Sequence, residues 1–360
     1  MKKILVITNH SYMLYRFRLD LLQELAKSHE VVLSMPFVGH EDDFRALGFR
    51  CIETNVDRRG INPKTDFSLL RTYRKLLKEE KPDLVITYSI KPNIYGGIAC
   101  TSQGIPFCAN VQGLGTAFQK PFIARLVTLL YRYAFRRVRK VFFENEANAQ
   151  EFRDRRILTP ERQAVLHGAG IRLDRYPLSP YPENAVPHFL YLGRIMREKG
   201  IGELLEACKI LHQEGYSFHL DLVGFFEDDY QSQVDELVSL GIATFHGFQE
   251  TPLPYYVKSD CVVLPSYHEG MSNVLLEAAA VGRPLITGKI PGCMEAVDED
   301  RSGYLINIKD THSLVAAMKA FLSLSPDARK EMGLQGRKKM EKEFRKEDII
   351  AQTIQELQLP

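Results

Sequence analysis

The sequence predicts an α/β protein made of two successive units, each an open sheet of parallel strands joined by helices. The chain has 360 residues, which suggests two domains at the roughly 150 residues of an average domain. Short apolar runs rich in β-branched residues alternate with amphipathic stretches, a pattern typical of parallel strands and crossover helices. The pattern restarts after a proline-rich segment at 176–187, which we interpret as a linker.

Five strands are predicted on each side of that linker, which indicates one unit before it and one after it. The first unit, 1–175, contains predicted strands at 4–8, 31–35, 84–88, 107–111 and 141–144. The second unit, 188–340, contains predicted strands at 189–192, 219–223, 243–246, 261–265 and 284–287. A charged amphipathic stretch at 326–356 predicts helix, and we expect its last part, 341–360, to pack against the first unit. Ligands of open α/β sheets bind outside the carboxyl ends of the strands, so the loops after the strands are the places to search.

The composition is that of an ordinary folded protein. Hydrophobic residues make up 45% and charged residues 26%, without low-complexity tracts, which excludes disordered, collagen-like and disulfide-scaffold proteins. The six cysteines form no C-x-x-C pair, and we expect reduced thiols. No apolar stretch approaches the ~18 residues that span a bilayer, and the first apolar run is too short for a signal peptide. We therefore expect a cytoplasmic protein whose contact with a membrane is peripheral.

Charge is divided unevenly along the chain. Residues 1–180 hold 29 Lys and Arg against 18 Asp and Glu, and residues 181–360 hold 18 against 27. The net charge of +2 is therefore the sum of about +11 and −9. This asymmetry indicates that one half faces an anionic partner, and nucleic acid, a membrane and a diphosphate ligand are all compatible with the count.

A pair of acids follows the predicted strand at 261–265. Glu269 and Glu277 have seven residues between them and stand at a strand-to-helix junction. Ser272 or Asn273 can cap the helix, which leaves Glu269 in the loop and Glu277 in the first turns. Eight helical steps span about 12 Å, too far for the roughly 5 to 9.5 Å between the carboxylates of a glycoside hydrolase. The acids thus contact different parts of one extended ligand, or they are incidental acids on a capped surface helix.

A basic turn follows the predicted strand at 189–192. Gly193 begins the turn, and Arg194 and Lys199 bring two positive charges to the start of the next helix. The amides and the dipole of a helix N-terminus already favour an anion, so two cations there predict a diphosphate site. Alone, the loop is also compatible with a solvated turn. Its order and spacing relative to the two acids favour the diphosphate.

Together the two motifs resemble the donor-site pattern of the family-four glycosyltransferases, retaining enzymes that use nucleotide-sugar donors. The pattern G-R-x4-K-G followed by P-S-x2-E-G-x6-E reads here as 193–200 and 265–277. The resemblance extends over essentially the whole chain. Segments 91–96 and 113–115 are similar to the subgroup that builds bacterial capsular polysaccharide, lipopolysaccharide and lipid-linked oligosaccharides. It implies the GT-B fold, two Rossmann-like domains that face each other across a cleft.

The resemblance also implies roles for these residues. Arg194 and Lys199 would bind the donor diphosphate, Glu277 the ribose hydroxyls and Glu269 the hydroxyls of the transferred sugar, and Arg194, Lys199 and Glu269 would form the catalytic set. The chemistry agrees, because a carboxylate accepts two hydroxyl hydrogens and the cations neutralise charge on the leaving phosphate. No protein nucleophile is required. The other donor-binding residues expected are Gly193, Gly224, His246, Gly247, Gly270, Met271 and Ser272. We expect the base of the nucleotide to lie near 246–250.

The first half departs from the family in the loops expected to handle the acceptor. Many members have a Gly-Gly turn after the first strand, where this chain has His10, and a histidine after the strand at 84–88, where it has Lys91. Lys91 is compatible with a contact to the donor or with a place beside Pro92 at a helix start. Arg16 and Arg18 would meet an acceptor diphosphate, or they lie on an exposed helix face. The acceptor-binding residues expected are His10, Arg16, Arg18, Lys91 and Gly113.

Residues 120–140 combine seven Lys and Arg with bulky apolar residues and no acid. This composition is typical of a helix on an anionic membrane, where each basic residue adds about 1 kcal/mol of attraction. It also fits a helix that packs an apolar stripe on a sheet, and one helix can do both. No nucleic-acid recognition motif accompanies the charge. We expect Lys120, Arg125, Arg132 and Arg136 to contact the inner leaflet, and no nucleic-acid partner.

The sequence therefore predicts a retaining glycosyltransferase that moves a sugar from a UDP-hexose or UDP-N-acetylhexosamine to a polyprenyl-diphosphate-linked saccharide. No cofactor or metal is expected, because Arg194 and Lys199 supply the positive charge, and the acidic groups at 227–229 and 298–300 are interpreted as solvated turns. The alternatives are a sugar-nucleotide 2-epimerase of the same architecture and a non-catalytic nucleotide-sugar-binding protein. A Rossmann oxidoreductase is disfavoured because no G-x-G-x-x-G follows the first strand.

Overall fold

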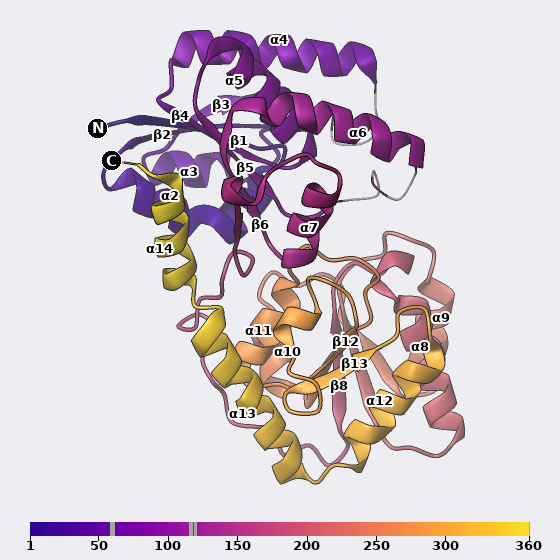
Figure 1. Cartoon of the computed structure of the whole chain (residues 1–360). Coiled ribbons are helices and arrows are strands. Elements are labelled where there is room, and N and C mark those ends of the chain that lie inside the picture. Colours follow the sequence, from indigo (N-terminus) through magenta and orange to yellow (C-terminus); the bar gives the residue numbers. More distant parts are fainter. Residues whose placement is uncertain (58–61, 115–117, 119–120, 360) are drawn as a thin grey trace. The chain divides into compact units, whose positions relative to one another are not determined.

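The computed structural model describes residues 1–57, 62–114, 118 and 121–359. The chain forms two compact units (Figure 1). Unit 1 comprises Met1–Ala169 and Glu347–Pro360, and unit 2 comprises Gly170–Lys346. All strand pairings within both sheets are parallel, which confirms the predicted α/β class.

Unit 1 contains a sheet of seven strands in the order β3-β2-β1-β4-β5-β6-β7. The strands are β1 (Lys3–Ile7), β2 (Glu30–Met35), β3 (Arg50–Glu53), β4 (Leu84–Tyr88), β5 (Phe107–Val111), β6 (Val138–Phe143) and β7 (Gln163–Val165). The sequence predicted five of them and missed β3 and β7. These two are the edge strands, and they are too short and too polar to produce an apolar run.

Helices cover both faces of this sheet. One face packs against side chains of α4, α5, α6 and α7, and the other against α2, α3 and α14. The helices of unit 1 are α1 (Ser11–Met13), α2 (Leu19–Ala26), α3 (Glu41–Ala46), α4 (Pro63–Glu80), α5 (Gly97–Gln103), α6 (Pro121–Ala134), α7 (Glu146–Asp154) and α14 (Lys346–Leu357). Two π-helical turns, at Leu14–Arg18 and Pro92–Gly96, lead into α2 and α5.

The predicted helix at 326–356 is two helices. The first, α13 (Pro326–Glu343), ends before Phe344 and is bound to unit 2, where Arg337 donates a hydrogen bond to the carbonyl of Ala280 at 2.8 Å. The second, α14, belongs to unit 1. Its Ile349 and Leu357 are buried there, and Glu356 pairs with Lys140 at 2.8 Å.

Unit 2 contains a sheet of six strands in the order β10-β9-β8-β11-β12-β13. The strands are β8 (His188–Leu192), β9 (His219–Val223), β10 (Ala243–Phe245), β11 (Cys261–Leu264), β12 (Leu285–Gly288) and β13 (Gly303–Ile306), of which only β13 was missed. The other helices of unit 2 are α8 (Ile201–Gln213), α9 (Gln231–Ser239), α10 (Leu253–Lys258), α11 (Asn273–Val281) and α12 (Thr311–Ser323).

The proline-rich segment at 176–187 is attached to unit 2. Tyr181 donates to the carbonyl of Asp260 at 2.8 Å, and Arg283 donates to the carbonyl of Pro180 at 2.7 Å. The division between the units falls earlier, between Ala169 and Gly170. The segment is therefore held on unit 2 by hydrogen bonds between side chains and backbone carbonyls.

The strand order creates one topological switch point in each sheet, where the first and the fourth strand along the chain are neighbours. In unit 1 the first strand, β1, lies next to the fourth, β4, and in unit 2 the first strand, β8, lies next to the fourth, β11. The crossovers on the two sides of this place lead in opposite directions, so the loops diverge and leave room for a ligand at the carboxyl ends. The residues after these strands form the sites described next.

Candidate active site

Three glycine turns at the ends of β8, β9 and β10 touch one another. The amide of Gly224 donates to the carbonyl of Gly247 at 2.9 Å. A Cβ on Gly224 would lie 1.8 Å from the carbonyl oxygen of Gly193, so the close approach requires glycine. All three were predicted to bind the donor. Because glycine has no side chain, a ligand can come close to the backbone at these three positions.

Lys199 and Glu269 meet across the place where β8 and β11 are neighbours. The Nζ of Lys199 lies 2.5 Å from Oε1 of Glu269, and their side chains are only 19% and 13% exposed. The turn that carries Lys199 ends at Gly200, where a Cβ would lie 2.1 Å from the carbonyl oxygen of Pro265. This contact seats the basic turn on the end of β11. The structure thus brings together two residues 70 positions apart.

Arg194 is more exposed than Lys199, and it pairs with Glu227 at 2.6 Å. The backbone of Arg194 is held in place by Tyr191, whose hydroxyl donates a hydrogen bond to the carbonyl of Arg194 at 2.6 Å. Burial, together with the nearby charge of Glu269, raises the pKa of Tyr191, so this hydroxyl remains a donor. An exposed ion pair contributes little to stability, and the Arg194 guanidinium is therefore available to an incoming anion.

The sequence suggested that the acidic groups at 227–229 and 298–300 are solvated turns, but in the structure both groups also make ion pairs. Glu227 pairs with Arg194, and Asp228 accepts a hydrogen bond from the amide of Arg197 at 2.8 Å. Asp298 pairs with Lys339 at 2.9 Å. The first group therefore holds the basic turn in place, and the second contacts α13.

The loop of Glu269 rests on a turn that the sequence analysis missed. Gly292, after β12, has a φ of +87°, and a Cβ on it would lie 2.5 Å from the carbonyl oxygen of Gly270. The carbonyl of Gly292 accepts a hydrogen bond from the amide of Ser272 at 2.9 Å. The side chain of Ser272 makes no capping bond to α11. Ser272 and the buried Met271 therefore contribute to the shape of the loop.

Glu277 lies in the early part of α11, as predicted, and its side chain is buried. Its Oε2 accepts a hydrogen bond from the hydroxyl of Tyr256 at 2.9 Å. Tyr256, on α10, is itself completely buried. No sequence motif pointed to Tyr256, which orients the carboxylate expected to bind ribose.

His246, at the end of β10, is held by a carboxylate. Its Nε2 lies 2.7 Å from one oxygen of Asp221, and Nδ1 of His188 lies 2.8 Å from the other. The ring of Tyr255 contacts His246 edge to face at 4.9 Å between centroids. A carboxylate only accepts, so it fixes a proton on Nε2 and leaves Nδ1 of a neutral His246 as an acceptor. Tyr255 precedes Tyr256, and α10 thus connects the base end of the expected donor site with Glu277.

The predicted acceptor residues of unit 1 have different surroundings. Arg18 is buried and pairs with Glu144 at 2.7 Å, so it does not lie on an exposed helix face. Lys91 pairs with Asp66 at 2.9 Å. Arg16 is half-buried in the π-helical turn before α2, the ring of His10 contacts Tyr12, and Gly113 lines a cavity.

Helix α6 has a core face and an exposed face. Ala124, Val127, Tyr131 and Ala134 are buried on the sheet side. The exposed residues of α6 mix large apolar groups with arginine: Phe122 (93% exposed), Arg125, Leu126, Leu129, Arg132 and Tyr133. Arg136, in the 3₁₀ turn that directly follows α6, is also exposed and is counted with this face. Arg132 also donates to the carbonyl of Arg155. Lys120 lies outside the described residues, and within the described part of the chain no helix has the length and apolarity needed to cross a bilayer.

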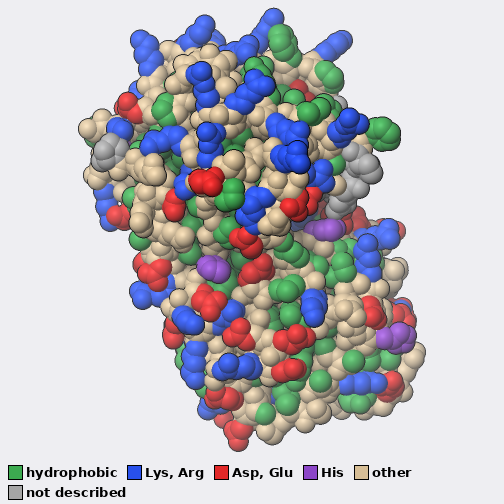
Figure 2. All heavy atoms as spheres, in the orientation of Figure 1, with side chains coloured by type: hydrophobic (Ala, Val, Ile, Leu, Met, Phe, Trp, Pro, Cys, Tyr) green, Lys and Arg blue, Asp and Glu red, His purple; other side chains and the backbone are tan. Residues whose placement is uncertain are grey.

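Figure 2 shows the charge division on the surface. Lys and Arg side chains gather over the upper part of this view, on unit 1, whereas acidic and basic side chains mix over unit 2. The basic excess of the first half of the sequence is therefore displayed at the surface of unit 1.

Comparisons with known proteins agree with this architecture. The family described as "Glycosyl transferase 4-like" matches residues 3–145, and "Glycosyl transferases group 1" matches residues 186–323. The chain is 26% identical over 323 residues, 84% of each protein, to the N,N'-diacetylbacillosaminyl-diphospho-undecaprenol alpha-1,3-N-acetylgalactosaminyltransferase of Campylobacter jejuni. It is 24% identical over 307 residues, 79% of this chain and 80% of the relative, to the capsular polysaccharide biosynthesis glycosyltransferase CapM of Staphylococcus aureus.

Solved structures share the fold. The crystal structure of Alr3699/HepE of Anabaena in complex with UDP and glucose matches 99% of both chains with a TM-score of 0.81 at 18% identity. Two parallel Rossmann-like sheets and the two family matches define the class of protein. The chain belongs to the group 1, GT4-like glycosyltransferases, which are retaining enzymes of the GT-B fold. The expected family, fold and enzyme class are confirmed.

The turn at Gly292 gives a test of how the acid loop is supported. We expect Gly292→Ala to lower the free energy of unfolding by about 3 kcal/mol or more, because it adds a backbone clash to the strain of a left-handed alanine. Urea unfolding followed by circular dichroism measures the change.

Gly241→Ala is the matched control. Gly241 also has a positive φ, +74°, but no atom of the described residues lies within 4 Å of its Cβ position, so only the conformational cost of about 1 kcal/mol remains. Equal losses in the two variants would show that Gly292 does not buttress the loop.

Proposed function

We propose that this glycosyltransferase moves a sugar, with retention, from a UDP-hexose or UDP-N-acetylhexosamine to a saccharide carried on a polyprenyl diphosphate. The observation that carries the proposal is the contact of Lys199 with Glu269 over the neighbouring strands β8 and β11. The names of similar proteins support it. The Campylobacter relative is named for an undecaprenyl-diphosphate-linked substrate, and the Anabaena structure contains UDP and glucose.

The two ion pairs of the site would exchange partners when the donor binds. Lys199 turns from Glu269, and Arg194 from Glu227, to the oxygens of the diphosphate. Glu269 is then free to accept hydrogen bonds from the hydroxyls of the transferred sugar. Glu277, held by Tyr256, accepts those of the ribose. Glu269 thus stabilises a cation before the donor arrives and gains the sugar hydroxyls as neutral partners afterwards.

The bond that breaks joins the anomeric carbon to the β-phosphate oxygen of the donor. Its electron pair leaves with UDP, and the charge on the leaving phosphate is neutralised by Arg194 and Lys199. The acceptor hydroxyl forms the new glycosidic bond on the same face of the sugar and gives its proton to the departing phosphate. Arg194 and Lys199 would thus supply the positive charge that a metal ion would otherwise supply to the leaving phosphate.

The base of the donor would lie beside His246 and Gly247. Phe225 and Phe248 stand next to this place, where both rings are exposed and 6.3 Å apart between centroids. Exposed aromatic faces suit a flat base, on which they stack. Asp221 fixes the orientation of His246, and Nδ1, the ring nitrogen that does not contact Asp221, would bind a polar group of the base.

The exposed face of α6 is proposed to lie on the cytoplasmic face of the inner membrane, where a polyprenyl-linked acceptor is held. Apolar and arginine side chains share this face. The apolar groups insert among the lipids and the arginines contact anionic headgroups. This arrangement would present the acceptor saccharide to unit 1.

Lys199→Met tests the donor site. We expect kcat/KM to fall by about 10²- to 10³-fold, because the variant loses one charged donor to the leaving phosphate. The assay screens UDP-sugars against polyprenyl-diphosphate-linked mono- and disaccharides. Lys209→Met, which removes the ion pair between the half-buried Lys209 of α8 and the exposed Glu236 of α9, is the control and should keep wild-type activity. A Lys199→Met enzyme within a few-fold of wild type would refute the donor-site assignment.

Flotation with anionic vesicles tests the membrane face. Arg125→Gln with Arg136→Gln should weaken binding roughly 30-fold, at about 1 kcal/mol for each charge near the surface. The control, Lys75→Gln with Lys78→Gln, removes two exposed charges from α4 and should float like the wild type. Failure of the wild type to float, or equal losses in both double variants, would contradict the proposal.

A further inference from the structure

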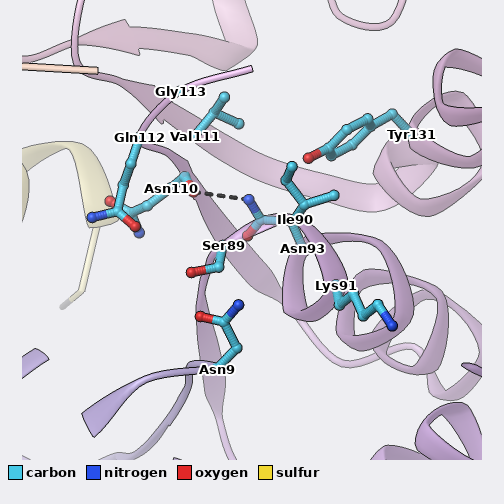
Figure 3. A pocket seen from close by; sticks show the side chains of 10 residues that line it. All are labelled: Asn9, Ser89, Ile90, Lys91, Asn93, Asn110, Val111, Gln112, Gly113 and Tyr131. Carbon is cyan, nitrogen blue, oxygen red and sulfur yellow. Dashed lines mark hydrogen bonds between the residues drawn. The ribbon is translucent and has the colours of Figure 1, made fainter. Parts of the chain in front are cut away.

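A cavity of about 240 Å³ lies in unit 1 where β1 and β4 are neighbours (Figure 3). Asn9 follows β1, Ser89 follows β4 and Gln112 follows β5. This is the place at which the strand order of the sheet leaves room for a ligand. The cavity is small beside the 300 Å³ or more of common ligand pockets, a size that suits one sugar ring better than a nucleotide.

Apart from Lys91, the polar side chains that line this cavity carry neutral amides and hydroxyls. Figure 3 shows Asn9, Ser89, Asn110 and Gln112 gathered around one space. An amide offers both donors and an acceptor, and a hydroxyl can do either. Such a mixture matches the hydroxyl and acetamido groups of a sugar, each of which both donates and accepts.

A buried network holds Asn110 in place, because the Nδ2 of Asn110 donates to the carbonyl of Thr87 at 3.3 Å and the side chains of Thr87 and Asn93 connect back to Asn110. The hydroxyl of Thr87 donates to Oδ1 of Asn93 at 2.7 Å, and Nδ2 of Asn93 donates to the carbonyl of Asn110 at 2.8 Å. Ser89 has a φ of +76°, a strained conformation for serine that the surrounding structure maintains. Asn110 and Ser89 are therefore positioned before any ligand binds.

No positive charge of the lining is available to a diphosphate. Lys91 is the only charged residue among the described residues that line the cavity, and it pairs with Asp66 at 2.9 Å, with exposures of 12% and 6%. Its amino end points away from Asn9 and Gln112 in Figure 3. Removing Lys91 would leave the buried carboxylate of Asp66 without a cation to balance its charge, which is strongly unfavourable. Lys91 therefore stays with Asp66.

We infer that this cavity binds an uncharged pyranose ring, the terminal sugar of the acceptor, and that the acceptor's diphosphate is bound outside it. The inference rests on the proposed transferase function and identifies what unit 1 recognises. The amides hold the hydroxyls of the ring, and the apolar side chains of Ile90 and Val111, which also line the cavity, cover its C–H faces. Neither Lys91 nor Arg18, which pairs with Glu144, is the diphosphate ligand.

Binding of simple glycosides tests the inference without turnover. The probes are the methyl glycosides of glucose, galactose, N-acetylglucosamine and N-acetylgalactosamine, observed by saturation-transfer difference NMR with the full chain and no donor. At least one glycoside should bind, and inorganic pyrophosphate should not displace it. Gln112→Leu and Asn9→Ala should each raise its Kd about 10-fold. Gln23→Leu, an exposed glutamine of α2, is the matched control and should bind as the wild type does.

Three results would overturn the inference: no glycoside binds, pyrophosphate displaces the bound glycoside, or both cavity variants bind as the wild type does. Steady-state kinetics then separates the two sources of a sugar. The cavity variants should raise the KM for the acceptor and leave the KM for the donor unchanged, whereas a rise in the donor KM alone would overturn the assignment to the acceptor. Glycoside binding by a chain that transfers no sugar would support the sugar site and refute the proposed function.

Discussion

Both sites depend on one constraint, the order in which the parallel strands are laid down. In each sheet the first strand lies between the second and the fourth, and the crossovers leave it in opposite directions. The loops after the first and fourth strands are thus neighbours with open space above them. In unit 2 this places Lys199 opposite Glu269, and in unit 1 it places Asn9 beside Ser89. The same topology gives a charged site in one unit and a neutral site in the other, because the loop residues differ.

Charge pairing explains how the two sites can differ in their ligands. In unit 2, Arg194 pairs with a carboxylate at the surface, where exchange for a phosphate is cheap. The partly buried Lys199–Glu269 pair would separate only because both members gain new partners, the diphosphate and the sugar hydroxyls. In unit 1, Arg18 and Lys91 pair with Glu144 and Asp66 in buried positions, where loss of the partner is costly. The unit with the excess of basic residues therefore keeps two of its cations inside the fold. Net charge did not identify the ligand of either unit.

The sequence was sufficient for features that are local in the chain. Gly193, Lys199, Glu269 and Glu277 stand at strand-to-helix junctions, where strand pattern and spacing fix their positions. The supports of these residues come from elsewhere. Gly292 reaches the acid loop from β12, Tyr256 reaches Glu277 from α10, and Asp221 reaches His246 from β9. Only the strand order brings these elements together, and the spacing of residues in the sequence does not predict that order. The burial of Arg18 could not be predicted for the same reason, because its partner Glu144 is 126 residues away.

The central claim is that unit 2 binds the donor diphosphate through Lys199, and ³¹P NMR of UDP tests it directly. On titration with the protein, the β-phosphate resonance of UDP should shift and broaden with the wild type and with Lys209→Met. With Lys199→Met the change should require at least a tenfold higher protein concentration. An unchanged titration with Lys199→Met, in a variant that keeps its fold by circular dichroism, would contradict the account.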